Sequence, residues 1–173
     1  MDSEQRGYPP TDADERTTLV AYLDWHRDTL RIKTAGLDAA QLDTPHPPSG
    51  MTLGGLLKHL AYVENWWFRS VMAGYADEPW ASVDWDADED WDWHSAKDDT
   101  PAQLRDLFEA EVARSDAVLA SYDSLDALAV RTNHRTGGPY HLRWILVHML
   151  EEYARHNGHA DLIREAVDGS VGS

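Results

Sequence analysis

The sequence contains 173 residues, of which 42% are hydrophobic, so the chain is long enough to bury a substantial core. Its formal net charge of −16 disfavours nucleic acid and anionic membranes as partners, because both attract clustered lysine and arginine. The absence of cysteine excludes disulfides and thiolate ligands, so a metal must be bound by His, Asp or Glu, and thiol chemistry requires a thiol from outside.

The amino-terminal stretch MDSEQRGYPP is polar and lacks the apolar segment of a secretory signal. No apolar run approaches the length needed to span a membrane. We therefore expect a cytoplasmic protein with a single domain over residues 1–173, in which residues 1–10 form a flexible tail.

The first two predicted helices cover residues 12–36 and 52–74. Apolar residues recur near helical spacing in the first, and Gly36 is a plausible stop. The second carries one continuous apolar stripe, formed by Leu53, Leu56, Leu57, Leu60, Val63 and Trp67.

The third predicted helix, 101–122, begins with a clear signal. Thr100 is the expected N-cap, Pro101 takes the first helical position, and Gln103 closes a capping box. The fourth, 140–167, follows the turn sequence TGGP and ends just before Gly169.

No segment shows convincing period-two alternation, which predicts an all-α protein. Four long amphipathic helices in a chain of this size predict a four-helix bundle. The connections between the first three helices, about 15 and about 25 residues, are long for helical hairpins, and such loops are often functional or cross over between helices.

The connection between the second and third helices contains the acidic, aromatic stretch EPWASVDWDADEDWDWH. One interpretation is a solvated loop held down by a few aromatic side chains. The other is a lid or wall over a binding pocket, whose tryptophans exclude water and select the substrate. We predict that residues 75–99 lie over or beside the mouth of such a pocket.

The fourth helix carries polar residues on its apolar side. At 100° per residue, His148, Glu152 and His156 fall within an arc of about 80°, which also contains His159 and the apolar Ile145 and Ile163. Glu152 and His156 project from successive turns and can bind one ion together, with His59 on the second helix as a candidate third ligand. The alternative is a weak Glu–His ion pair beside an ordinary core histidine, and spacing alone leaves it open.

Three stretches resemble the helices of the DinB-like superfamily of four-helix proteins. They are LVAYLDWHRDTLRIKTAGLDAAQL, TLGGLLKHLAYVENWWFRSVMAG and LRWILVHMLEEYARHNGHADLIREAVDG, similar to the first, second and fourth helices. Within this superfamily, they resemble more closely the actinobacterial branch near mycothiol-dependent transferases and maleylpyruvate isomerase. This resemblance implies a DinB-like bundle with a metal triad at His59, Glu152 and His156.

The resemblance leaves other residues with weaker assignments. After the last ligand, the family usually has one variable residue, then Gly and Gln. Here His156 is followed by Asn157, Gly158 and His159, so the role of His159 stays open. His148, one turn before Glu152, is expected to orient a ligand. Trp67 is a candidate pocket residue, and Arg143 either holds an anionic substrate group or pairs with a carboxylate of the protein.

Two imidazoles and one carboxylate leave coordination positions open, which is typical of catalytic metal sites. Zinc suits these ligands best, although nickel, iron(II) and manganese also fit. The resemblance implies that a low-molecular-weight thiol such as mycothiol attacks a small electrophile. We therefore expect a metal-dependent transferase or isomerase, and whether it forms a homodimer is left open.

Two alternatives remain at this stage. The chain could be a non-enzymatic, stress-associated bundle that only binds metal, or a structural module whose polar stripe is a buried network. A metal assay separates the second alternative from the others, and turnover with a thiol and an electrophile separates the first.

Overall fold

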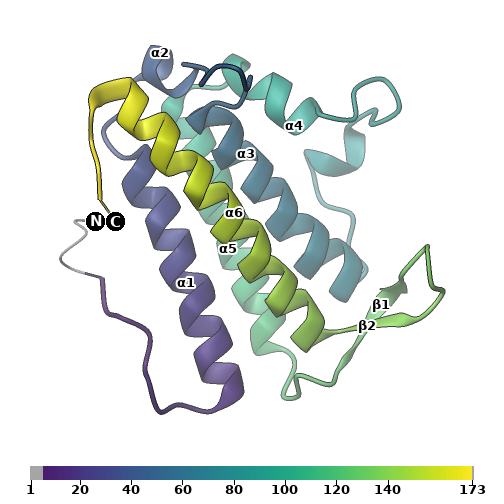
Figure 1. Ribbon diagram of the computed structural model, residues 1–173. Helices are drawn as coiled ribbons and strands as arrows, with labels where there is room; N and C mark the ends of the chain where they lie inside the picture. Colours follow the sequence, from purple (N-terminus) through teal and green to yellow (C-terminus); the bar gives the residue numbers. More distant parts are fainter. Residues whose placement is uncertain (1–5, 173) are drawn as a thin grey trace.

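A computed structural model describes residues 6–172 and shows a mostly helical protein (Figure 1). The long helices are α1 (Glu15–Thr34), α3 (Leu53–Glu64), α5 (Pro101–Ala120) and α6 (Leu142–Asp168), and α3 continues without a break into the π-helical segment η2 (Asn65–Met72). Helix α1 packs against α6 and α3 against α5, while α3 also contacts α1 and α6. These contacts place α3 next to every other long helix.

Local capping explains where the helices begin and end. The Thr52 hydroxyl accepts a 2.9 Å hydrogen bond from the Gly55 amide at the start of α3. The capping box of Thr100 and Gln103 is confirmed at the start of α5. Helix α6 ends at Gly169, whose φ of 76° is the left-handed conformation that glycine adopts without strain. The predicted bounds of the four helices are correct to within about three residues.

The long connections contain short helical turns of their own. The connection from α1 to α3 includes α2 (Ala39–Leu42), and the connection from η2 to α5 includes η3 (Trp80–Ser82), α4 (Trp91–His94) and η4 (Ser95–Asp98). In Figure 1, α4 lies beside the N-terminal end of α3. Both connections therefore contain regular secondary structure.

The prediction of a purely helical chain is wrong between α5 and α6. Strands β1 (Leu128–Thr132) and β2 (Pro139–His141) form an antiparallel hairpin, whose turn is closed by hydrogen bonds between Asn133 and the glycines Gly137 and Gly138. Strands this short offer too few residues to show a period of two. The hairpin packs against η2 and leads directly into α6.

A buried ion pair joins the long helices at the centre of the molecule. The Arg27 guanidinium on α1 donates two hydrogen bonds of 2.8 Å to the Glu64 carboxylate on α3, and the Tyr153 hydroxyl on α6 donates one of 2.7 Å to the same carboxylate. All three residues are 0% exposed. Because each charge is fully paired, the cost of burying it is offset by bidentate, charge-assisted bonds.

The ends of this network reach toward solvent. The third guanidinium nitrogen of Arg27 donates to Asp24 on α1 and to Asp116 on α5, so α5 also takes part. Burial by itself would lower the pKa of Arg27, but the charge and hydrogen bonds of Glu64 hold that pKa well above its ordinary value. This shift favours the charged guanidinium at neutral pH.

Part of the predicted tail, residues 1–5, lies outside the described residues. The remainder rests on α1, where the Arg6 guanidinium lies 3.5 Å from the centre of the Trp25 ring. Among residues 6–172, no helix combines the length and apolar character that crossing a membrane requires.

We predict that Glu64→Ala lowers the free energy of unfolding by about 3–5 kcal/mol, because it leaves the Arg27 charge buried without its partner. Urea unfolding followed by circular dichroism measures this loss. The matched control is Glu109→Ala, which removes the exposed carboxylate that pairs with Arg31 and should cost no more than about 1 kcal/mol. Equal losses in the two variants would contradict a central role for the buried pair.

Candidate metal centre

The structure brings together the three predicted ligands. His59 projects from α3, and Glu152 and His156 project from adjacent turns of α6; one donor atom of each lies within 4.8 Å of the other two. The ring centres of the two histidines are also 4.8 Å apart. His156 is buried, while His59 and Glu152 are half-buried. The cluster therefore lies in the seam between the two helices and keeps access to solvent.

The donor spacing suits a shared divalent ion. The Nε2 atom of His156 lies 3.4 Å from a carboxylate oxygen of Glu152. Two ligands bound at about 2.1 Å with a tetrahedral angle would lie about 3.4 Å apart. Imidazole and carboxylate donors are also those that zinc and related first-row metals prefer. The geometry and the donor chemistry both fit a metal, and the role of these residues as ligands stays a prediction.

The surroundings of Glu152 favour its ionised, negatively charged carboxylate. A hydrogen bond from His156 lowers its pKa below the ordinary value, and the charges of His148 and His59 act in the same direction, while burial opposes them. His148 Nε2 lies 3.4 Å from the second carboxylate oxygen. His148 lies where it can orient Glu152, and this role stays a prediction.

Asp92, which the sequence analysis did not single out, orients His59. Its carboxylate oxygen lies 2.6 Å from His59 Nδ1, and Asp92 is only 3% exposed. A histidine that donates through Nδ1 presents Nε2 as the free donor atom. Histidine ligands of metals commonly hydrogen-bond a carboxylate in this way, and the bond sets both the tautomer and the direction of the ring.

Trp93 covers the same histidine. Its indole stacks on the His59 ring with centroids 4.4 Å apart and an angle of 23° between the planes. Helix α3 makes room for this indole at Gly55, where a Cβ atom would lie 2.9 Å from it. Glycine is needed at position 55 because Trp93 occupies the space of a side chain.

Other aromatic residues hold the segment from Tyr75 to Asp99 against the protein. The Trp80 indole donates a 3.0 Å hydrogen bond to the buried carboxylate of Glu111, and Trp85 stacks on Tyr62 of α3. Trp91 lies under the Lys58 ammonium at 4.5 Å. The segment therefore lies beside the cluster, and the further prediction that it acts as a lid stays untested.

His159 extends the cluster on its other side. Its Nδ1 atom lies 3.4 Å from His156 Nδ1. Burial and the neighbouring charges of His156 and Arg155 lower the pKa of His159, which favours the neutral ring at pH 7. A neutral His159 can accept a hydrogen bond from the Nδ1–H group of His156 and leave His156 Nε2 directed at Glu152.

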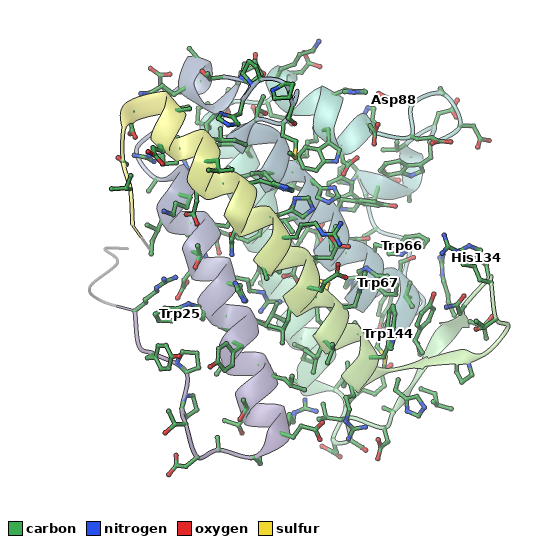
Figure 2. All side chains as sticks on the ribbon, in the orientation of Figure 1. Trp25, Trp66, Trp67, Asp88, His134 and Trp144 are labelled. Carbon is green, nitrogen blue, oxygen red and sulfur yellow. The ribbon has the colours of Figure 1, made fainter. Side chains whose placement is uncertain are left out.

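Trp67 and His148 belong to an aromatic group at the start of α6. Trp67 makes an edge contact with His148, and Trp144 stacks on His148 with centroids 5.0 Å apart. Figure 2 shows Trp66, Trp67 and Trp144 together near the hairpin. His148 contacts both this group and Glu152, so the His148 side chain lies between Trp67 and the candidate ligands.

The structure does not place Arg143 in the cluster. Its guanidinium pairs with Glu15 on α1 and Asp126 before β1, which is the second of the two roles considered for it. His148, Glu151 and Glu152 form another group of closely spaced donors, but Glu151 is exposed. The more buried group with His59 and His156 is the better candidate for an ion.

The fold and the cluster define a mostly helical protein with a candidate metal centre in the seam between two helices. Over residues 18–169, the sequence matches the family described as mycothiol-S-transferase. The chain therefore belongs to this family, which lies within the DinB-like superfamily that its helices resemble. A search of curated proteins gave no match. Membership suggests mycothiol-related transferase activity, with a low-molecular-weight thiol and a small molecule as substrates.

We predict that Asp92→Ala weakens Zn²⁺ binding by about 10–100-fold, because His59 loses the partner that sets its orientation. Competition with a chromophoric chelator measures the affinity. Asp92→Asn should lose less, since its amide oxygen can still accept from His59 Nδ1. Asp98→Ala, which removes an exposed carboxylate nearby, is the control and should bind Zn²⁺ as the unmodified protein does.

Proposed function

We propose that this protein is a metal-dependent transferase that joins a low-molecular-weight thiol of the mycothiol type to a small electrophile. The observation that carries the proposal is the convergence of His59, Glu152 and His156, with one of these ligands oriented by a buried carboxylate. Family membership supports the choice of the thiol. Since the chain has no cysteine, the sulfur must come from the co-substrate.

In this proposal, His59 and His156 would hold the metal through Nε2, and Glu152 would hold it through its carboxylate. When bound, the divalent ion would supply the Lewis acidity that keeps a thiol deprotonated near neutral pH. The thiol sulfur then forms a bond to the electrophilic carbon, the leaving group departs with the bonding electrons, and the thiol proton passes to solvent.

The surrounding residues have separate tasks. Asp92 fixes the direction of the His59 ring, and His148 and His159 do the same for Glu152 and His156. The Trp93 indole covers one side of His59 and excludes water from it. The half-buried position of Glu152 leaves an approach for substrate from the solvent side.

We predict that His156→Ala abolishes stoichiometric metal binding and lowers mycothiol conjugation by at least about 100-fold, a loss of about 2.7 kcal/mol of transition-state stabilisation. Elemental analysis and conjugation of mycothiol with monobromobimane measure the two quantities. The helices should remain, because the buried Arg27–Glu64 pair and the apolar core do not depend on His156.

The control is His134→Ala, which removes an exposed histidine from the turn of the hairpin and should change neither quantity. Metal binding without conjugation of any electrophile would favour the non-enzymatic alternative. Full metal occupancy in a variant without both His59 and His156 would show that the ligands lie elsewhere.

A further inference from the structure

A pocket of about 540 Å³ lies between the connection that precedes α3 and the segment that contains α4. One wall comes from the connection before α3, with Asp43, Ser49 and Thr52, and the other from the α4 segment, with Asp90, Trp93 and Lys97. Its volume is in the range of sites that hold small-molecule ligands. None of the roles assigned so far uses it.

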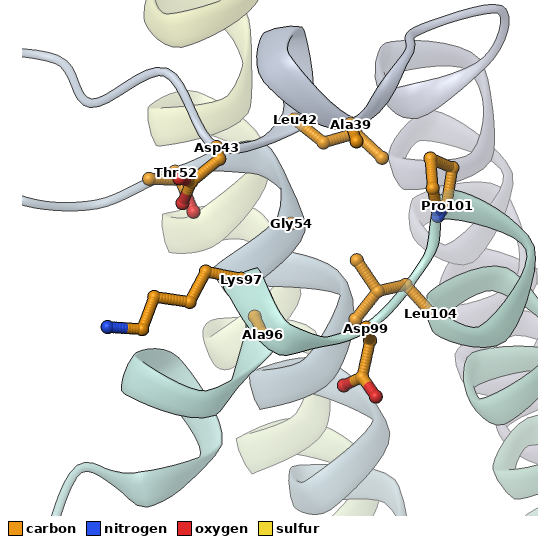
Figure 3. A pocket seen from close by; sticks show the side chains of 10 residues that line it. All are labelled: Ala39, Leu42, Asp43, Thr52, Gly54, Ala96, Lys97, Asp99, Pro101 and Leu104. Carbon is orange, nitrogen blue, oxygen red and sulfur yellow. The ribbon is translucent and has the colours of Figure 1, made fainter.

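A much smaller neighbouring cavity, about 20 Å³, lies beneath α2 and has room for little more than a water molecule. Figure 3 shows this cavity, with Asp43, Thr52 and Lys97 at one side of it. The same three residues also line the large pocket, so they mark the boundary between the two spaces. Only the large pocket can accept a substrate.

The pocket and the metal cluster share a wall. Trp93 lines the pocket, and the same indole stacks on His59 and lies 5.6 Å from the His156 ring. None of the three candidate ligands lines the pocket, so a molecule bound there would touch Trp93 and reach the ligands around the edge of that indole. The pocket is therefore placed to hold the non-reacting part of a thiol co-substrate.

The lining chemistry indicates what this part is. Asp43 and Asp90 provide carboxylate acceptors, Lys97 provides an ammonium donor, and Ser49 and Thr52 provide hydroxyl groups that donate and accept. The lining has two carboxylates against one ammonium, and its His94 already pairs with Asp88, so it disfavours a phosphate or another anion. An indole face beside hydrogen-bonding groups of both kinds matches an uncharged polyhydroxylated ring, which is apolar on its C–H face and polar at its edge.

We infer that this pocket binds the polyhydroxylated, non-reacting part of the thiol co-substrate and so selects a sugar-linked thiol over a simple one. The inference rests on the proposed function and specifies where its co-substrate binds. Binding energy from the polyol then positions the thiol sulfur at the metal cluster on the other side of Trp93.

Gly50 allows the pocket to be filled without disturbing the fold. It lines the pocket, and a Cβ atom added there would meet no other atom within 4 Å. Gly50→Phe should therefore occupy the space of the polyol. Gly7→Phe is the matched control, because Gly7 has the same free space but lies in the amino-terminal segment.

The experiment compares mycothiol with N-acetylcysteine, which has a cysteinyl thiol but no polyol, in monobromobimane conjugation by zinc-loaded protein. We expect Gly50→Phe to raise the KM for mycothiol by about tenfold or more, as the loss of one or two good hydrogen bonds would do. The kcat/KM for N-acetylcysteine should change by less than about twofold. Gly7→Phe should behave as the unmodified protein with both thiols.

A calorimetric titration with S-methyl mycothiol, whose sulfur is blocked, tests the pocket without turnover. Binding that Gly50→Phe removes and Gly7→Phe keeps supports the inference even if no conjugation is seen, a result that would count against the proposed function alone. Equal KM values for mycothiol in all three proteins, or equal binding of the blocked thiol, would overturn the inference and leave the metal site unaffected.

Discussion

The bidentate pair between Arg27 and Glu64, with the Tyr153 hydroxyl on the same carboxylate, sets the relative position of α1, α3 and α6. An apolar core tolerates sliding by part of a helical turn, because many contacts are nearly equivalent. A buried carboxylate that accepts three directed hydrogen bonds does not, since any shift leaves a charge unpaired. Tyr153 follows Glu152 directly in the sequence, so the bond that holds Tyr153 also positions the candidate ligands of α6 opposite His59 on α3.

The metal cluster depends on a second constraint, which comes from outside the long helices. Asp92 and Trp93 are consecutive residues of α4, and one orients the His59 ring while the other covers it. Contacts that hold this segment in place, such as the hydrogen bond from Trp80 to Glu111, therefore affect the cluster through Asp92 and Trp93. Helices α3 and α6 bring the donors together, and the connecting segment determines which atom of His59 is free to bind.

Helical period and capping signals were sufficient to predict the long helices, and the polar stripe on an apolar face pointed to His148, Glu152 and His156. The central pair left a readable signal that was not used: Arg27 lies between Leu23 and Leu30 at core spacing, and Glu64 lies one turn after Leu60. Asp92 left none, because it is one of several acidic residues in its segment and only the fold distinguishes it. The short strands of the hairpin were missed for lack of length, as their pairing is set by the turn at Asn133.

The hydrogen bond from His59 to Asp92 also links the cluster to the local stability of α4. Whatever favours the oriented His59 ring must favour the docked α4 segment by the same free energy, since the two states are thermodynamically coupled. Under the proposed assignment, an ion in the cluster would slow the opening of α4, and an opening of α4 would speed the exchange of the ion. The backbone amides of this short helix would then report, through their hydrogen-exchange rates, how fully the distant half of the site on α6 is occupied.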